Sequence, residues 1–199
     1  MSHRTPTLDI SLQLETLSRS LVSTLPELAH IDLDRVLFTF SRSRRPGRGG
    51  LLARITPLRG KSGSRSLERQ RGNYHETWEI PSLLHDDREI LYLITILIPR
   101  FLHLEPKERL RTLLHELWHI SPECDGDIRR FPGKRYAHGT SSHRFEVTVE
   151  QLTVRYLERH PDLPELLTLP ASSWHKGQVR LQGLRVRRPR ARLVARRKR

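Results

Sequence analysis

The feature that most constrains this chain is a set of ionisable side chains on a helix with an apolar stripe. Pro106 suits the first turn of a helix, and leucines at helical spacing predict that it runs to about residue 120. His115, Glu116 and His119 follow the pattern HExxH on this helix. Two imidazoles and a carboxylate on a buried helix face cost free energy unless they have partners. The fold must therefore build a polar site around this helix.

The spacing of these residues predicts a metal site. Side chains four residues apart lie on one face of a helix, so the imidazoles of His115 and His119 can converge on one Zn²⁺. Glu116 lies one step around the helix and can act as general base toward an attacking water without ligating the metal. Chance placement in a chain of this composition gives about 0.04 such motifs. The pattern predicts a zinc hydrolase, and its alternative is a pair of histidines with a structural role.

A catalytic zinc usually has three protein ligands, so the motif requires one more. Asp125 lies six residues after His119, as in metzincins, but Pro122 stands where that pattern has glycine. Glu146 begins an ExxxE sequence on the next predicted helix, as in gluzincins. Both acids remain candidates at this point.

Two histidines are the stronger candidates for the third ligand. His138 precedes Gly139 in a loop, directly before a helix predicted over residues 141–160. His143 lies in the first turn of that helix. We predict that His138 is the third ligand and keep His143 as the alternative.

The rest of the chain predicts an α+β fold. Apolar spacing indicates an N-terminal helix over residues 7–23. The expected strands cover 35–41, 51–58, 74–80 and 90–98, and the last of these is an apolar run typical of a buried strand. Residues 59–73 are rich in Gly, Ser and Arg and are expected to be mobile. The final helix has apolar residues on two sides, which predicts packing on both, and residues 178–195 predict a basic hairpin or a disordered tail.

Positive charge is concentrated in two segments. The chain has 36 Lys and Arg against 22 Asp and Glu, and residues 176–199 hold 11 of the basic residues and no acid. Residues 42–71 hold ten basic residues against one acid. We therefore predict a domain at 1–175 and an Arg-rich tail at 176–199, with nucleic acid as a partner of both basic segments.

Several local sequences around the motif resemble a known family. They are Thr112 to Ile120 (TLLHELWHI), Gly126 to Arg130 (GDIRR), His138-Gly139, Ser41 to Arg44 (SRSR), Ala53 to Ile55 (ARI) and Tyr92 to Leu102 (YLITILIPRFL). Together they are similar to the phage and prokaryotic metallopeptidase domain related to SprT-like zinc proteases, over roughly residues 30–157.

The resemblance implies a minimal zincin-like core. This core has a small sheet, the HExxH helix and a second helix that brings the third ligand, with the N-terminal helix added. SprT-like proteins place that ligand in a His-Gly pair, which corresponds to His138 here. The chain departs from them in the length of the loop between His119 and His138, which keeps His143 in consideration. It also departs in its C-terminal region, where an Arg-rich segment replaces a zinc ribbon. SprT-like proteases act on DNA-bound proteins.

The function predicted from these features is hydrolysis of peptide bonds in a protein or peptide substrate. Tyr136, His143 and Arg129 are candidates to stabilise the oxyanion. The alternative is a nucleic-acid-binding protein with a structural or vestigial zinc site. The single cysteine, Cys124, excludes an internal disulfide framework. No apolar run reaches the roughly 20 residues of a membrane span, and no signal peptide is expected, so we predict a cytoplasmic protein with no membrane partner.

Overall fold

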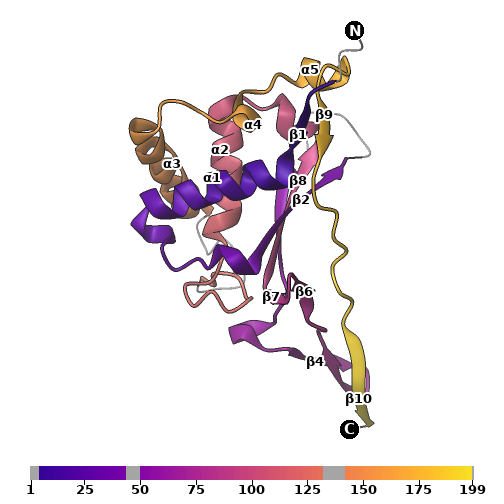
Figure 1. The fold of residues 1–199 in the computed structure, drawn as a ribbon. Coiled ribbons are helices and arrows are strands. Elements are labelled where there is room, and N and C mark those ends of the chain that lie inside the picture. The colour runs from indigo at the N-terminus through magenta and orange to yellow at the C-terminus, as the bar shows by residue number, and fades with distance from the viewer. Residues whose placement is uncertain (1–4, 44–49, 132–141, 199) are drawn as a thin grey trace.

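The computed structural model describes residues 5–43, 50–131 and 142–198 (Figure 1). The helices are α1 (Ile10–Thr24), α2 (Pro106–Trp118), α3 (Ser142–Arg159), α4 (Glu165–Thr168) and α5 (Ala171–His175). The strands are β1 (Thr7–Asp9), β2 (Val36–Arg42), β3 (Ala53–Pro57), β4 (Ser66–Arg71), β5 (Tyr74–Glu79), β6 (Leu83–His85), β7 (Arg88–Ile90), β8 (Tyr92–Ile98), β9 (Arg180–Gln182) and β10 (Arg192–Lys198). The mixed α and β content confirms the predicted α+β class. No helix in these described ranges is long and apolar enough to cross a membrane.

The centre of the molecule is a three-stranded sheet in the order β2-β8-β3. β8 lies in the middle, parallel to β2 and antiparallel to β3. Nearly all of β8 is buried, which explains why its sequence is continuously apolar rather than alternating. β3 is hydrogen-bonded within the sheet only to β8, so its other edge faces the region of α2.

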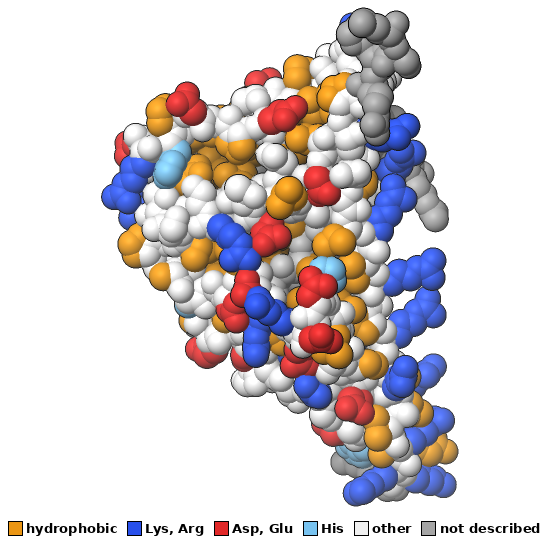
Figure 2. Space-filling model, in the orientation of Figure 1, with side chains coloured by type: hydrophobic (Ala, Val, Ile, Leu, Met, Phe, Trp, Pro, Cys, Tyr) orange, Lys and Arg blue, Asp and Glu red, His pale blue; other side chains and the backbone are white. Residues whose placement is uncertain are grey.

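The outer face of this sheet is covered by the C-terminal segment, by which we mean residues 176–198. Leu184 and Val186 pack against a second apolar cluster that includes Leu37 and Leu93. The strand β9 pairs with β1, and β10 pairs with β5. The segment therefore lies along the body as an extended chain, and its basic side chains form a row at the edge of the molecule (Figure 2). This differs from the predicted hairpin or disordered tail, because Leu184 and Val186 pack on an open sheet face rather than on each other.

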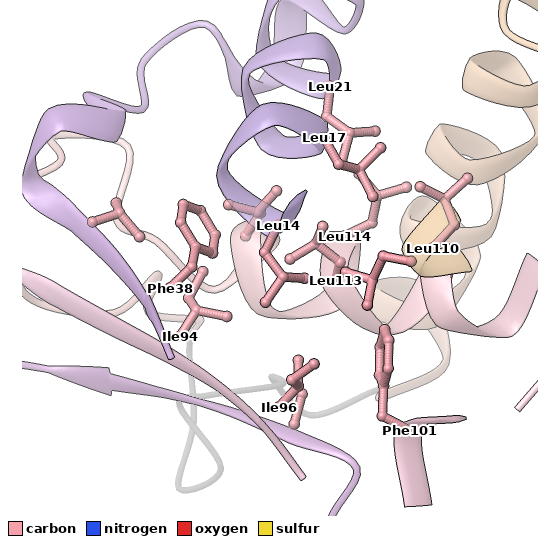
Figure 3. Packing of buried hydrophobic residues seen from close by; sticks show 14 of the residues in the cluster. Leu14, Leu17, Leu21, Phe38, Ile94, Ile96, Phe101, Leu110, Leu113 and Leu114 are labelled. Carbon is pink, nitrogen blue, oxygen red and sulfur yellow. The ribbon is translucent and has the colours of Figure 1, made fainter. Parts of the chain in front are cut away.

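The inner face of the sheet forms the main core with α1 and α2. Phe38 and Ile94 are register partners that point to this face. Leu14 from α1 and Leu114 from α2 meet them there (Figure 3). All four side chains are buried. Because α2 is fixed on this face by its leucine stripe, the opposite side of α2 is held in a defined orientation.

A second three-stranded sheet, in the order β10-β5-β4, projects away from the helices (Figure 1). Residues 59–73, which we expected to be mobile, contain a 3₁₀ turn at Lys61–Gly63 and the strand β4. The central strand β5 pairs with β4 on one side and with β10 on the other. The prediction was wrong because pairing with a neighbouring strand can order a polar segment. The periodicity of the segment's own sequence does not show that pairing.

Helix α3 is buried along one side only. Phe145 and Val149 are among its buried residues, as predicted for the first apolar stripe. Val147 and Val154, on the second stripe, are 38% and 40% exposed. The expectation of packing on both sides is therefore wrong for these two residues.

Arg109 is a buried charge that joins α2 to its neighbours. Its guanidinium donates to the carbonyl oxygens of Leu104, Leu166 and Leu169, at 2.8–3.0 Å, and to that of Leu102 at 2.5 Å. These carbonyls belong to the turn before α2 and to the region of α4. A single side chain thus supplies the hydrogen bonds that these buried carbonyl groups need.

We expect Arg109→Met to lower the free energy of unfolding by about 3 kcal/mol or more. Methionine takes the place of the aliphatic stem of the arginine, but the four carbonyls lose their donor. Each unsatisfied buried acceptor costs about 1–3 kcal/mol. Urea unfolding followed by circular dichroism measures the change. Arg144→Met, at an exposed position on α3, is the control and should stay within about 0.5 kcal/mol of the wild type. Equal stability of the two variants would show that Arg109 is not required.

Candidate functional site

The HExxH residues lie at the C-terminal end of α2. The helix ends at Trp118, and His119 is its C-cap residue. The Nε2 atoms of His115 and His119 lie 3.2 Å apart, and their rings meet edge to face with centroids 4.8 Å apart. The two imidazoles therefore converge on one point, as the spacing in the sequence predicts.

The end of α2 is held in place by Arg129. Its backbone N–H donates to the carbonyl of His119 at 2.6 Å. Its guanidinium donates to the carbonyl of Trp118 at 2.9 Å and lies 3.9 Å over the indole ring. Arg129 was one of the candidates to stabilise the oxyanion. In the structure its guanidinium contacts Trp118 at the end of α2.

Helix α3 brings two side chains to the histidine pair. The ring of Phe145 packs against both imidazoles, with centroid distances of 4.9 Å to His115 and 4.7 Å to His119. The Oε1 atom of Glu146 lies 3.3 Å from Nδ1 of His115. A carboxylate at Nδ1 favours the tautomer that carries its proton there and leaves the lone pair on Nε2. The contact therefore favours a lone pair on Nε2 of His115, the atom that lies 3.2 Å from Nε2 of His119.

Glu116 is buried between α2 and the edge strand β3. Its exposed fraction is 7%. Burial raises the pKa of Glu116 to about 7, while a hydrogen bond from the backbone of Ile55 acts in the opposite direction. Glu116 lines a pocket of about 360 Å³, and His115 lines the same pocket. The other lining residues are Gly50, Leu51, Leu52, Ala53, Arg111, Thr112 and Glu146.

The predicted third ligands do not complete the site within the described residues. His138, and with it Tyr136, lies outside the described residues. His143 is exposed on α3. The Oδ1 of Asp125 accepts hydrogen bonds from Ser121 and from the backbone of Asp127. The described ranges contain no group of three His, Cys, Asp or Glu side chains that could hold a metal, and the identity of the third ligand stays a prediction.

The sequence analysis missed the residues that support the loop after α2. Asp127 is buried and accepts two hydrogen bonds from Arg130 and one from the backbone of Ser62. The hydroxyl of Tyr92 donates to the Asp127 carbonyl and accepts from the backbone N–H of Gly126. Asp127 and Arg130 belong to the GDIRR sequence, and Tyr92 is the first residue of β8. These positions were the only hint in the sequence, and in the structure the residues support the loop after α2.

The comparison with protein families agrees with this site. A family model described as "putative phage metallopeptidase" matches residues 10–152. The chain belongs to this family. The match runs from the start of α1 to within α3, so it includes the HExxH residues and the side chains that α3 brings to them. The description of this family is that of a peptidase that uses a metal, which implies protein or peptide substrates. No curated protein and no solved structure shows a significant match to this chain.

Proposed function

We propose that this member of the family is a zinc-dependent peptidase, in which His115 and His119 are metal ligands and Glu116 is the general base. The observation that carries the proposal is the 3.2 Å separation of the two Nε2 atoms. Two ligands of a tetrahedral zinc, each about 2.0–2.1 Å from the metal, would lie about 3.3–3.4 Å apart. The observed separation is close to this value, which supports two zinc ligands here. In this proposal the sheet β2-β8-β3, α2 and α3 form a zincin-like core related to SprT-like proteases.

The proposed roles of the residues follow from their positions. Zinc would supply Lewis-acid activation of a water molecule and of the scissile carbonyl. Glu116 lies at the pocket wall next to His115, where its carboxylate can accept a proton from the attacking water and pass it to the leaving amine. Glu146 would position the His115 imidazole through Nδ1, and His138 would be the third ligand.

The alternative function is a nucleic-acid-binding protein in which the zinc site is structural or vestigial. A structural zinc needs four protein ligands and no open position. Within the ranges that the structure describes, His115 and Glu116 line an open pocket next to β3. This arrangement favours the catalytic role.

Metal dependence tests the proposed function. We expect one zinc per chain by elemental analysis, loss of peptide hydrolysis after treatment with a chelator, and recovery on adding zinc. The His115→Ala variant should bind no stoichiometric zinc, whereas His175→Ala, at an exposed position on α5 beside His103, should retain it. Full hydrolysis by the zinc-free protein would refute the proposal.

The contact between Glu146 and His115 gives a separate prediction. We expect Glu146→Ala to weaken zinc binding by about 10–100-fold, the usual effect of removing a hydrogen-bond partner of a ligand. Glu150→Ala is the matched control, because Glu146 and Glu150 both form ion pairs with Arg111, but only Glu146 contacts His115. Competition with a chromophoric chelator measures both affinities. If the two variants bind zinc equally, Glu146 does not position His115.

A further inference from the structure

The outer face of the central sheet carries a pocket of about 480 Å³ that is lined by four arginines. They are Arg42, Arg54, Arg185 and Arg187, and we call this the arginine pocket. Hydroxyl groups of Thr39, Ser41 and Thr95 complete its polar lining. No Asp or Glu is among the residues that line it. The pocket therefore presents hydrogen-bond donors and positive charge, with no carboxylate to compensate them.

The fold brings these arginines together from distant parts of the chain. Arg54 on β3 is the register partner of Thr95 on β8, and Thr95 pairs in turn with Thr39 on β2, so all three lie on the same face of the sheet. Arg42 is the last residue of β2. The pocket thus includes arginines from one of the two basic stretches of the sequence.

The other two arginines come from the second basic stretch, in the C-terminal segment. Leu184 and Val186 are partly buried against the sheet, while Arg185 and Arg187 alternate with them and are exposed. The guanidinium of Arg185 also lies 5.2 Å over the ring of Phe40. Packing of the apolar residues therefore fixes the two arginines beside the sheet, and the pocket is a built feature of the fold.

The arginine pocket gathers four guanidinium groups without acids to pair them. Within the described ranges, none of its four arginines forms an ion pair. Other arginines are paired with an acid, and they include Arg19, Arg59, Arg65, Arg88, Arg111, Arg130 and Arg155. Four guanidinium groups around one hollow repel one another, and an anion bound there would relieve that repulsion. Phosphate is the anion whose geometry a guanidinium matches in a bidentate manner.

The positive surface continues beyond the pocket along the C-terminal segment (Figure 2). Residues 185–198 are extended and would span about 40 Å at roughly 3.3 Å per residue. The exposed basic residues beyond the pocket are Arg188, Arg190, Arg192, Arg196, Arg197 and Lys198. A row of this length fits a linear polyanion better than it fits a small phosphorylated molecule.

The far end of the row joins the projecting sheet β10-β5-β4. Opposite residues of adjacent strands share a face, so Arg71, Tyr74 and Lys198 lie on one face. The next two residues of β5 on that face are Glu76 and Trp78. Basic side chains and aromatic rings on one sheet face are the combination that binds nucleic-acid strands, because phosphates pair with the charges and bases stack on the rings.

We propose that the arginine pocket and residues 188–198 bind the sugar–phosphate backbone of a nucleic acid, with phosphate groups held in the pocket. This inference does not depend on the proposed peptidase activity. Deletion of the C-terminal segment would not be a clean test of this inference. Deleting residues 176–199 would remove β9, β10 and the packing of Leu184 and Val186 on the sheet, so point substitutions are required.

The test compares two double variants of equal charge on the same segment. Arg185→Gln/Arg187→Gln alters the arginine pocket, and Lys176→Gln/Arg180→Gln alters exposed basic residues near β9. Fluorescence anisotropy measures binding of a labelled single-stranded oligonucleotide and of the corresponding duplex over a range of salt concentrations. We expect the pocket variant to bind at least tenfold more weakly than the control. Its slope of log affinity against log salt should be less steep by about 1–2, because each phosphate contact contributes roughly 0.7–0.9.

Further arms of the test distinguish other ligands. Arg42→Gln/Arg54→Gln, on different elements, should reproduce the loss and keeps the proposal testable if Arg185→Gln/Arg187→Gln does not fold. Vesicles containing phosphatidylserine are included because Leu193 and Val194 are exposed, by 46% and 62%. Equal nucleic-acid affinity of pocket and control variants would overturn the proposal. Binding to vesicles or to inorganic phosphate alone, with no affinity for nucleic acid, would also overturn it.

Discussion

Replacing Glu116 by Gln is expected to leave zinc bound and the fold intact but to lower peptide hydrolysis by a factor of about 10²–10⁴. The amide has nearly the same size as the carboxylate and fits the same buried position beside β3. It can still accept a hydrogen bond from the backbone of Ile55, which the structure gives to Glu116. It cannot accept a proton from water, so only the chemical step is lost. Turnover of a fluorogenic peptide, zinc content and thermal unfolding are measured on the same preparation.

The control for this experiment is Glu108→Gln, on the same helix two turns earlier. Glu108 is about half exposed and pairs with Arg111 at 3.3 Å, away from the histidine pair. It should retain hydrolysis within a few-fold of the wild type. A Glu116→Gln protein that keeps wild-type turnover would remove Glu116 from the role of general base, whatever the metal content.

The elements that carry the HExxH residues could be predicted from local sequence. Pro106 and the leucine stripe predict α2 because they are local signals of a helix start and of a buried face. The apolar run that forms β8 is predicted for the same reason, since a strand covered on both faces needs apolar residues throughout. The convergence of His115 and His119 follows from helix geometry alone.

The surroundings of the site could not be predicted in the same way. Nothing in local periodicity shows that Glu146 faces Nδ1 of His115, because that contact depends on how α3 packs on α2. Local sequence places Arg109 near a helix start but does not show that its guanidinium donates to four buried carbonyls. Pairing of β10 with β5 joins segments more than a hundred residues apart. Such contacts are decided by tertiary packing, which no window of sequence contains.

The same reason explains why the two basic stretches were predicted separately. Their residue types were clear in the sequence, but their meeting depends on strand register and on the burial of Leu184 and Val186. The register of β2, β8 and β3 places Arg54 on the face that the C-terminal segment covers. The charge of each stretch was therefore predictable, and the pocket that they form together was not.

The third zinc ligand gives the second prediction with a large expected effect. We expect His138→Ala to weaken zinc binding by more than about 100-fold, beyond the effect of losing an outer partner of a ligand. Without His138, the zinc would keep only two of the three protein ligands that a catalytic zinc usually has. His138 precedes α3, the helix that brings Phe145 and Glu146 against the histidine pair. His143→Ala is the matched control, and it should bind zinc as the wild type does, because His143 is exposed and belongs to no ligand group in the described ranges.

Zinc content after dialysis and competition with a chelator distinguish the possible ligand sets. Loss of zinc in His143→Ala together with retention in His138→Ala would reverse the assignment. Retention in both variants would leave a carboxylate as third ligand. Asp125 is already hydrogen-bonded to Ser121 and to the Asp127 backbone, so Glu146 would then be the stronger candidate. In that case Glu146→Ala should abolish zinc binding rather than weaken it by 10–100-fold, because a ligand and not its hydrogen-bond partner would have been removed.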